Sequence, residues 1–134
     1  MQNRRTFLGI AAASLLPLGV DAQTPAPRSP AELARHALTG PFEGWEAVLV
    51  ELNIPPGTRS TGPGHRHPGP ALGYVVEGQL SFGINHEPER VVPAGGTFFE
   101  PAGALHTTHG SARPDGPTRV MVFMVVPKGN PLSS

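Results

Sequence analysis

The sequence predicts an all-β domain, built as a β-sandwich or a small barrel. Three observations predict it: apolar residues fall in short β-branched runs, glycine and proline separate these runs, and the runs lack helical periodicity. The 17 glycines and 17 prolines make up about a quarter of the 134 residues, and their positions between the runs mark turns. A chain of this length favours a single domain.

Composition excludes several classes of function. The ten basic and ten acidic side chains cancel, so the charge predicts no binding to nucleic acid or to an anionic membrane. The chain has no cysteine, which excludes disulfides, thiolate metal ligands and cysteine nucleophiles. Patterns typical of serine-hydrolase triads, phosphate-binding loops or dinucleotide sites are also absent.

The first 22 residues are typical of a secretory signal peptide. A basic start with Arg4 and Arg5 precedes an apolar stretch over residues 7–20, which is too short and, because of Pro17, too interrupted to span a membrane. The start resembles a twin-arginine export signal, although Asn3 stands where serine or threonine is usual; an ordinary secretory signal is the alternative. We therefore expect a periplasmic or extracytoplasmic protein that has no membrane attachment once the signal is removed.

After the signal, residues 23–29 are predicted to be a polar linker, and the domain is predicted to cover residues 30–130. Ser29-Pro30-Ala31-Glu32 has the pattern of a helix N-terminus, with a capping serine, a proline at the first position and a glutamate at the third. A short helix is therefore expected over Pro30–Leu38, and Gly40-Pro41 would end it.

The remaining apolar runs predict strands. In residues 45–54, Val48, Val50, Leu52 and Ile54 alternate with more polar neighbours, which indicates a half-buried strand. Further strands are predicted at short spacing over residues 72–77, 79–84, 90–92, 97–100 and 104–108. The last strand, 118–126, is almost continuously apolar, so we expect it to be central and buried on both faces.

Three histidines form the most informative pattern in the chain. Residues i and i+2 of a strand point to the same face, so His65 and His67 can aim two imidazoles at one point, and Arg66 must point away. A third imidazole would come from His106 on a neighbouring strand, after a tight turn at Gly103. We therefore predict a metal site made of His65, His67 and His106.

These residues resemble the two motifs of the cupin superfamily, G-x5-H-x-H-x3–4-E-x6-G and G-x5-P-x-G-x2-H-x3-N. The matching positions are His65, His67 and Gly78 for the first motif, and Gly95, Pro101, Gly103 and His106 for the second. The resemblance covers residues 45–126. It implies a single-domain cupin β-barrel, or jelly roll, that holds a metal ion inside the barrel through the motif histidines.

Two positions depart from the family pattern. Ala71 stands at the carboxylate of the first motif, and Gly110 stands at the asparagine of the second. The site is therefore expected to have three histidines and no carboxylate, which leaves a coordination position open and the full charge on the ion. Two glutamates are candidate substitutes. Glu77 has the right strand parity but lies too far along, and Glu100 is expected to be a structural or entrance residue near a turn.

The other histidines and the tyrosine are not expected to bind the metal. His109 has the wrong parity relative to His106, so it should point outward unless a bulge re-aims it. His86 lies in a polar turn, and His36 lies at the end of the predicted helix. Tyr74 falls on the opposite face from Ala71, and so away from the site.

Two classes of function fit this pattern. The resemblance implies a metal-dependent dioxygenase that acts on a small chelating substrate, as in three-histidine thiol and diketone dioxygenases. The alternative is a non-catalytic binding or sensor protein for a small ligand; a structural relic without metal is disfavoured by the three intact histidines. The cofactor would be one divalent transition metal (Fe, Zn, Cu, Ni or Mn), since imidazole suits this group. The partner would be a small molecule, and a homodimer is expected by resemblance alone.

Overall fold

The computed structural model describes residues 30–60 and 62–134, so the predicted signal peptide and linker lie outside the described residues. The described chain is almost entirely strand. Its elements, in chain order, are β1 (Ala31–Ala37), the 3-10 turn η1 (Gly40–Phe42), β2 (Trp45–Ile54), β3 (His65–Arg66), β4 (Ala71–Glu77), β5 (Gln79–Ile84), β6 (Arg90–Pro93), β7 (Thr97–Glu100), β8 (Leu105–Ser111) and β9 (Thr118–Pro127).

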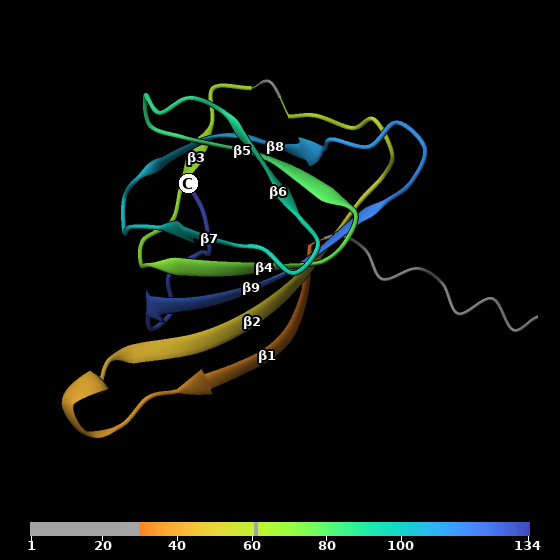
Figure 1. The fold of residues 1–134 in the computed structure, drawn as a ribbon. Helices are drawn as coiled ribbons and strands as arrows, with labels where there is room; N and C mark the ends of the chain where they lie inside the picture. The colour runs from red at the N-terminus through yellow and green to blue at the C-terminus, as the bar shows by residue number, and fades with distance from the viewer. Residues whose placement is uncertain (1–29, 61) are drawn as a thin grey trace, which may run out of the picture.

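The strands form two antiparallel sheets, which confirms the predicted all-β, jelly-roll class of fold. One sheet has five strands in the order β1-β2-β9-β4-β7, and the other has four in the order β3-β8-β5-β6. Figure 1 shows the two sheets facing each other, with β1 and β2 extending beyond the four-stranded sheet. The C-terminus lies beside β3, far in sequence but close in space.

The helix predicted over Pro30–Leu38 is wrong, because these residues form the edge strand β1. This strand pairs with β2 from Ala31 opposite Glu51 to Ala37 opposite Glu46, with one irregularity between Glu32 and Ala34. An isolated helix this short is marginal in water, whereas β2 offers a full row of backbone partners. Tertiary pairing therefore overrides the local capping pattern.

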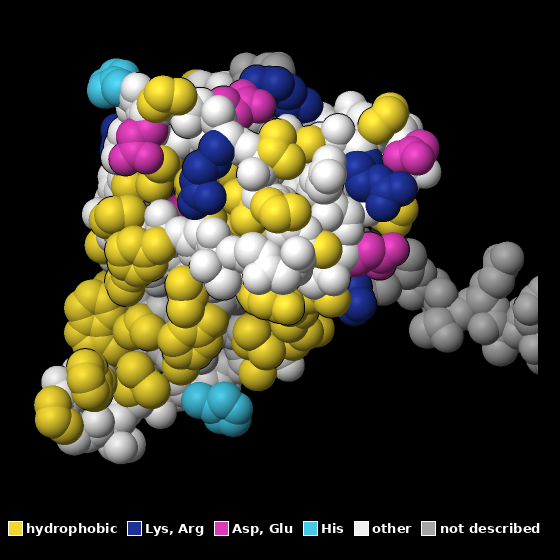
Figure 2. Space-filling model, in the orientation of Figure 1, with side chains coloured by type: hydrophobic (Ala, Val, Ile, Leu, Met, Phe, Trp, Pro, Cys, Tyr) yellow, Lys and Arg dark blue, Asp and Glu magenta, His cyan; other side chains and the backbone are white. Residues whose placement is uncertain are grey.

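The core lies between the sheets, where each strand buries alternate residues. In β2, Val48 and Val50 are buried as the alternation predicts. In β9, Val120, Val122, Met124 and Val126 are buried. The strand is central, as expected, but it is not buried on both faces: Phe123 on its other side is 45% exposed. No part of the described chain covers the outer face of the five-stranded sheet, and Figure 2 shows hydrophobic side chains gathered over its strands.

No helix in residues 30–60 and 62–134 has the length and apolar character needed to cross a membrane.

Candidate metal centre

The three predicted histidines meet at one end of the barrel. His65 in β3 lies directly opposite His106 in β8, and His67 follows β3 two residues later, on the same side of the chain as His65. The imidazole centroids of His65 and His67 lie 4.8 Å apart, and those of His65 and His106 lie 5.0 Å apart. Arg66 between them points outward, where its guanidinium donates to the carbonyl of Gly103 at 2.5 Å.

That contact places Arg66 on the turn that precedes His106. Gly103 has a φ of +73°, in the left-handed region that glycine tolerates best. Its N–H donates to the carbonyl of His67 at 2.9 Å, and the N–H of Ala104 closes the turn onto Pro101 at 3.0 Å. The tight turn predicted after Pro101 therefore links the two histidine segments directly.

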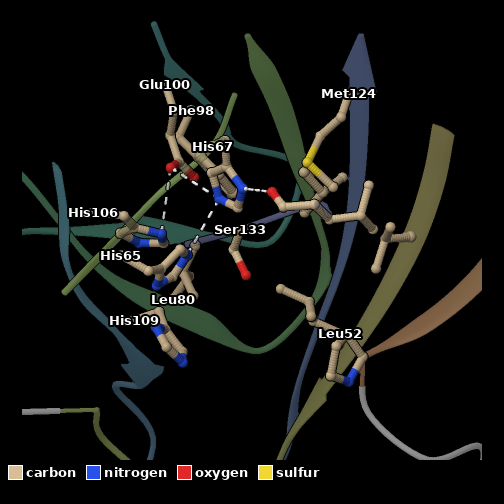
Figure 3. A pocket seen from close by; sticks show the side chains of 14 residues that line it. Leu52, His65, His67, Leu80, Phe98, Glu100, His106, His109, Met124 and Ser133 are labelled. Atoms are coloured by element: carbon tan, nitrogen blue, oxygen red, sulfur yellow. Dashed lines mark hydrogen bonds and ion pairs between the residues drawn. The ribbon is translucent and has the colours of Figure 1, made fainter. Parts of the chain in front are cut away.

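The structure adds a carboxylate that the sequence analysis placed elsewhere. Glu100 is not an entrance residue; it is 2% exposed and points into the histidine cluster. Its Oε2 lies 3.5 Å from Nε2 of His67 and 3.4 Å from Nδ1 of His106. Dashed lines mark both contacts in Figure 3. Glu100 ends β7 and lies directly opposite Ala71 in β4.

The register places the Glu100 carboxylate beside Ala71. Residues opposite each other in an antiparallel pair share a face, with Cβ atoms about 4.5–5.5 Å apart. Ala71 is fully buried and small, so the carboxylate from the adjacent strand reaches the same region of the barrel. Phe98 and Glu100 lie two residues apart in β7 and so share a face, and Phe98 is buried. This alternation was the pattern in the sequence that could have predicted an inward Glu100. Glu77, the other substitute considered, is exposed beyond a register irregularity at the end of β4.

His109 is the second residue that the sequence analysis placed differently. The pairing of β5 with β8 shifts between Gly83 and Ile84, which face Thr108 and His106 respectively. The extra residue at Thr107 reverses the alternation, so His109 joins His106 on the inner side. The His109 ring lies 5.4 Å from that of His106 and 5.8 Å from that of His65. The prediction that His109 points outward is therefore wrong, and the reason is the bulge that had been named as its exception.

Two backbone carbonyls orient the histidine rings. Nδ1 of His67 donates to the carbonyl of Leu132 at 2.6 Å, and Nε2 of His106 donates to the carbonyl of Thr108 at 2.9 Å. A carbonyl only accepts, so each of these nitrogens carries the proton and the other nitrogen keeps its lone pair. The lone pairs of both rings then face Glu100. Histidines that ligate metals are commonly held in this way.

The C-terminal segment is therefore part of the site. Besides the Leu132 carbonyl, the N–H of Arg66 donates to the carbonyl of Ser134 at 2.9 Å, and the N–H of Ser134 donates back at 3.0 Å. These bonds hold residues 132–134 alongside β3.

Burial dominates the protonation of the cluster. It raises the pKa of Glu100 to about 7. Burial, with additional repulsion from His65 and His109, lowers the pKa of His106 to about 4. Burial also lowers the pKa of His65 and of His109. These lowered pKa values favour the neutral form of His65, His106 and His109, which is the form that binds a metal ion.

One pair of donor atoms, from His65 and His67, has the spacing of two ligands on a transition-metal ion. Ligands held about 2.1 Å from one ion lie roughly 3.0–3.4 Å apart in octahedral or tetrahedral geometry, and Nε2 of His65 and His67 are 3.2 Å apart. Within the described chain, Glu100 Oε2 and His106 Nδ1 are the buried side-chain polar atoms without a hydrogen-bond partner. Two acceptors that face each other at 3.4 Å have no favourable interaction unless a cation or a proton lies between them.

Two overlapping groups of residues bring donors within 4.8 Å of one another: His67 with Glu100 and His106, and His65 with His106 and His109. His36 and His86 belong to neither group and are exposed, as expected. Tyr74 is 48% exposed on the outer face, also as expected.

The cluster forms one end of a pocket of about 280 Å³. Beyond the four histidines and Glu100, its lining is apolar apart from Ser133. The apolar walls come from both sheets and from the C-terminal segment: Pro30, Val50, Leu52, Leu80, Phe98, Val122, Met124 and Leu132.

Comparisons with known proteins identify the family. The model of the cupin domain family matches residues 50–126. A search of curated proteins finds no match. An uncharacterized conserved protein with a double-stranded β-helix domain from Klebsiella pneumoniae subsp. pneumoniae has a TM-score of 0.57 at 18% identity, over 75% of this chain and 76% of that one.

Two further solved structures share the fold. A cupin-like protein from Thermotoga maritima has a TM-score of 0.51 at 22% identity, over 66% of this chain and 62% of that one. A protein from Thermus thermophilus also has a TM-score of 0.51 at 22% identity, over 70% of this chain and 82% of that one. At these identities the likeness concerns the fold alone.

Proposed function

Since this chain belongs to the cupin domain family, we propose that it binds one divalent transition-metal ion in the pocket and acts there on a small chelating ligand. The ion would be held by His65, His67 and His106 together with Glu100. The observation that carries the proposal is the pair of buried, unpartnered atoms, Glu100 Oε2 and His106 Nδ1, that face each other 3.4 Å apart.

A bound ion would supply Lewis-acid chemistry and, if it is iron or copper, redox chemistry. The residues of the chain supply the rest. The carbonyls of Leu132 and Thr108 hold the His67 and His106 rings with their lone pairs inward. Glu100 offsets one of the two positive charges, so the site is less electrophilic than a site of three imidazoles alone. The apolar walls keep bulk water from the bound ligand.

The proposed reaction class is a dioxygenase reaction, in which both atoms of O2 enter the substrate. The second candidate is capture of a small ligand without turnover. It is favoured by the pocket lining, where His109 and Ser133 are the polar groups beyond the four proposed ligands. The proposal includes export to a periplasmic or extracytoplasmic location, for which residues 1–22 supply the support.

Elemental analysis of the purified protein tests the metal site, and oxygen uptake with thiols, β-diketones and flavonols tests the reaction class. Bound iron or copper with substrate-dependent oxygen uptake is the expected result. Zinc with no turnover across the panel would refute the dioxygenase and leave ligand capture. Full metal content in a His67→Ala variant would refute the site itself.

A further inference from the structure

The charge and the lining of the pocket together define the chemical class of its ligand. We propose that this ligand combines an oxygen-chelating head bearing one negative charge with an apolar body, and that dianions are rejected. The inference rests on the proposed metal site and goes beyond it by specifying what binds there.

The first step is the charge balance. A divalent ion with ionised Glu100 and three neutral imidazoles carries one net positive charge. Among residues 30–60 and 62–134, no lysine or arginine lines the pocket, so the described lining offers no second cation. A monoanionic head neutralises the site, whereas a dianion would leave a buried charge without a partner, which is costly in an apolar surrounding.

The second step is the shape and polarity of the remaining space. Leu52, Val122, Met124 and Leu132 are among the apolar residues that line the pocket, and Figure 3 shows Leu52 and Met124 across the pocket from His65 and His106. None of these side chains can hydrogen-bond to a polar ligand. A ligand that ended at its chelating head would leave this apolar space to water. Filling it with methylene groups is favourable, at about 0.8 kcal/mol for each CH₂.

The third step is size. A cavity of about 280 Å³ is at the small end for ligand pockets. At about 20 Å³ for each atom, it admits roughly a dozen non-hydrogen atoms. A head of four or five atoms with a chain of about six carbons falls within this limit.

Three matched acids test this ligand class on protein loaded with Co²⁺, whose visible spectrum reports both metal binding and ligand exchange. Glycolate has the head alone, 2-hydroxyoctanoate adds a hexyl body, and hexylmalonate keeps that body with a dianionic head. We expect 2-hydroxyoctanoate to bind at least about tenfold more tightly than glycolate, and at least about tenfold more tightly than hexylmalonate. Equal affinities for the first pair, or tighter binding of hexylmalonate, would overturn the inference.

A variant checks that the charge of the pocket sets the preference. Leu132→Arg adds a cation to the pocket wall and should raise the affinity for hexylmalonate by about tenfold. Val91→Arg, at an exposed position on β6, should leave the affinities unchanged. Failure to acquire a cobalt spectrum would refute the proposed metal site. A normal cobalt spectrum with no preference between the acids would refute the ligand class alone.

Discussion

Replacing Glu100 by glutamine should change the metal-free and metal-bound proteins in opposite directions. The amide keeps the shape of the carboxyl group but cannot ionise. In the metal-free protein it can donate to Nδ1 of His106 or to Nε2 of His67, which lie 3.4 and 3.5 Å from the carboxylate oxygen. With metal it removes an anionic ligand. We therefore expect the metal-free variant to be more stable than wild type at pH 8, and its metal affinity to be lower.

The magnitude follows from the pKa of Glu100. Burial raises this pKa from 4.5 to about 7, which corresponds to about 3 kcal/mol of unfolding free energy. Between these values the folded protein holds a proton that the unfolded chain has lost, so wild-type stability falls as the pH rises. The contribution is intact below pH 4.5 and is fully lost above about pH 7.

The contribution of His106 to stability has the opposite pH dependence, and it cancels when the variant is compared with wild type. Its pKa is lowered from 6.5 to about 4 by burial, so its contribution is lost as the pH falls through this range. Both proteins contain His106. The difference between their unfolding free energies therefore isolates Glu100: near zero at pH 4.5, and about 3 kcal/mol in favour of the variant at pH 8.

Urea denaturation of metal-free protein at pH 4.5, 6 and 8 measures this difference, and titration with Zn²⁺ at pH 8 measures affinity. We expect the affinity loss to exceed the roughly 10–100-fold typical for removal of a hydrogen bond that supports a ligand. Glu77→Gln is a matched control on an exposed glutamate and should change neither quantity. A stability difference independent of pH, or unchanged Zn²⁺ affinity, would refute the assignment of Glu100 as a buried ligand.

Three further predictions concern the scaffold of the site. Ending the chain after Gly129 removes the Leu132 carbonyl that holds His67, so Zn²⁺ affinity should fall roughly 10–100-fold. Leu132→Ala keeps that carbonyl and should change Zn²⁺ affinity little. Equal losses of affinity in the two variants would contradict the prediction. Gly103→Ala should cost about 1 kcal/mol in urea denaturation because φ is +73° with no atom near the added Cβ, against no loss for Gly62→Ala. Val120→Ala, fully buried in β9, should cost about 2–3 kcal/mol; a cost below the roughly 0.5 kcal/mol expected at an exposed site would contradict its place in the core.

Local patterns identified most of the strands. The predicted bounds of β2, β5 and β7 match those observed, because alternation with flanking turn residues is a property of a few consecutive residues. The same pattern paired His65 with His67. The helix predicted over Pro30–Leu38 failed where a neighbouring strand offered backbone partners that the local sequence cannot reveal.

Local patterns did not predict the inward orientation of the Glu100 and His109 side chains. Glu100 takes its place through its register opposite Ala71, and His109 through an irregularity between β5 and β8. Both depend on pairing between strands distant in the chain.

The sequence by itself determined the all-β class, the histidine pattern and the absence of a carboxylate at Ala71. Only the tertiary structure placed the Glu100 carboxylate beside His67 and His106 and left one face of β9 uncovered. The physical reason is that alternation assigns residues to faces within one strand, whereas cross-strand register decides which faces meet.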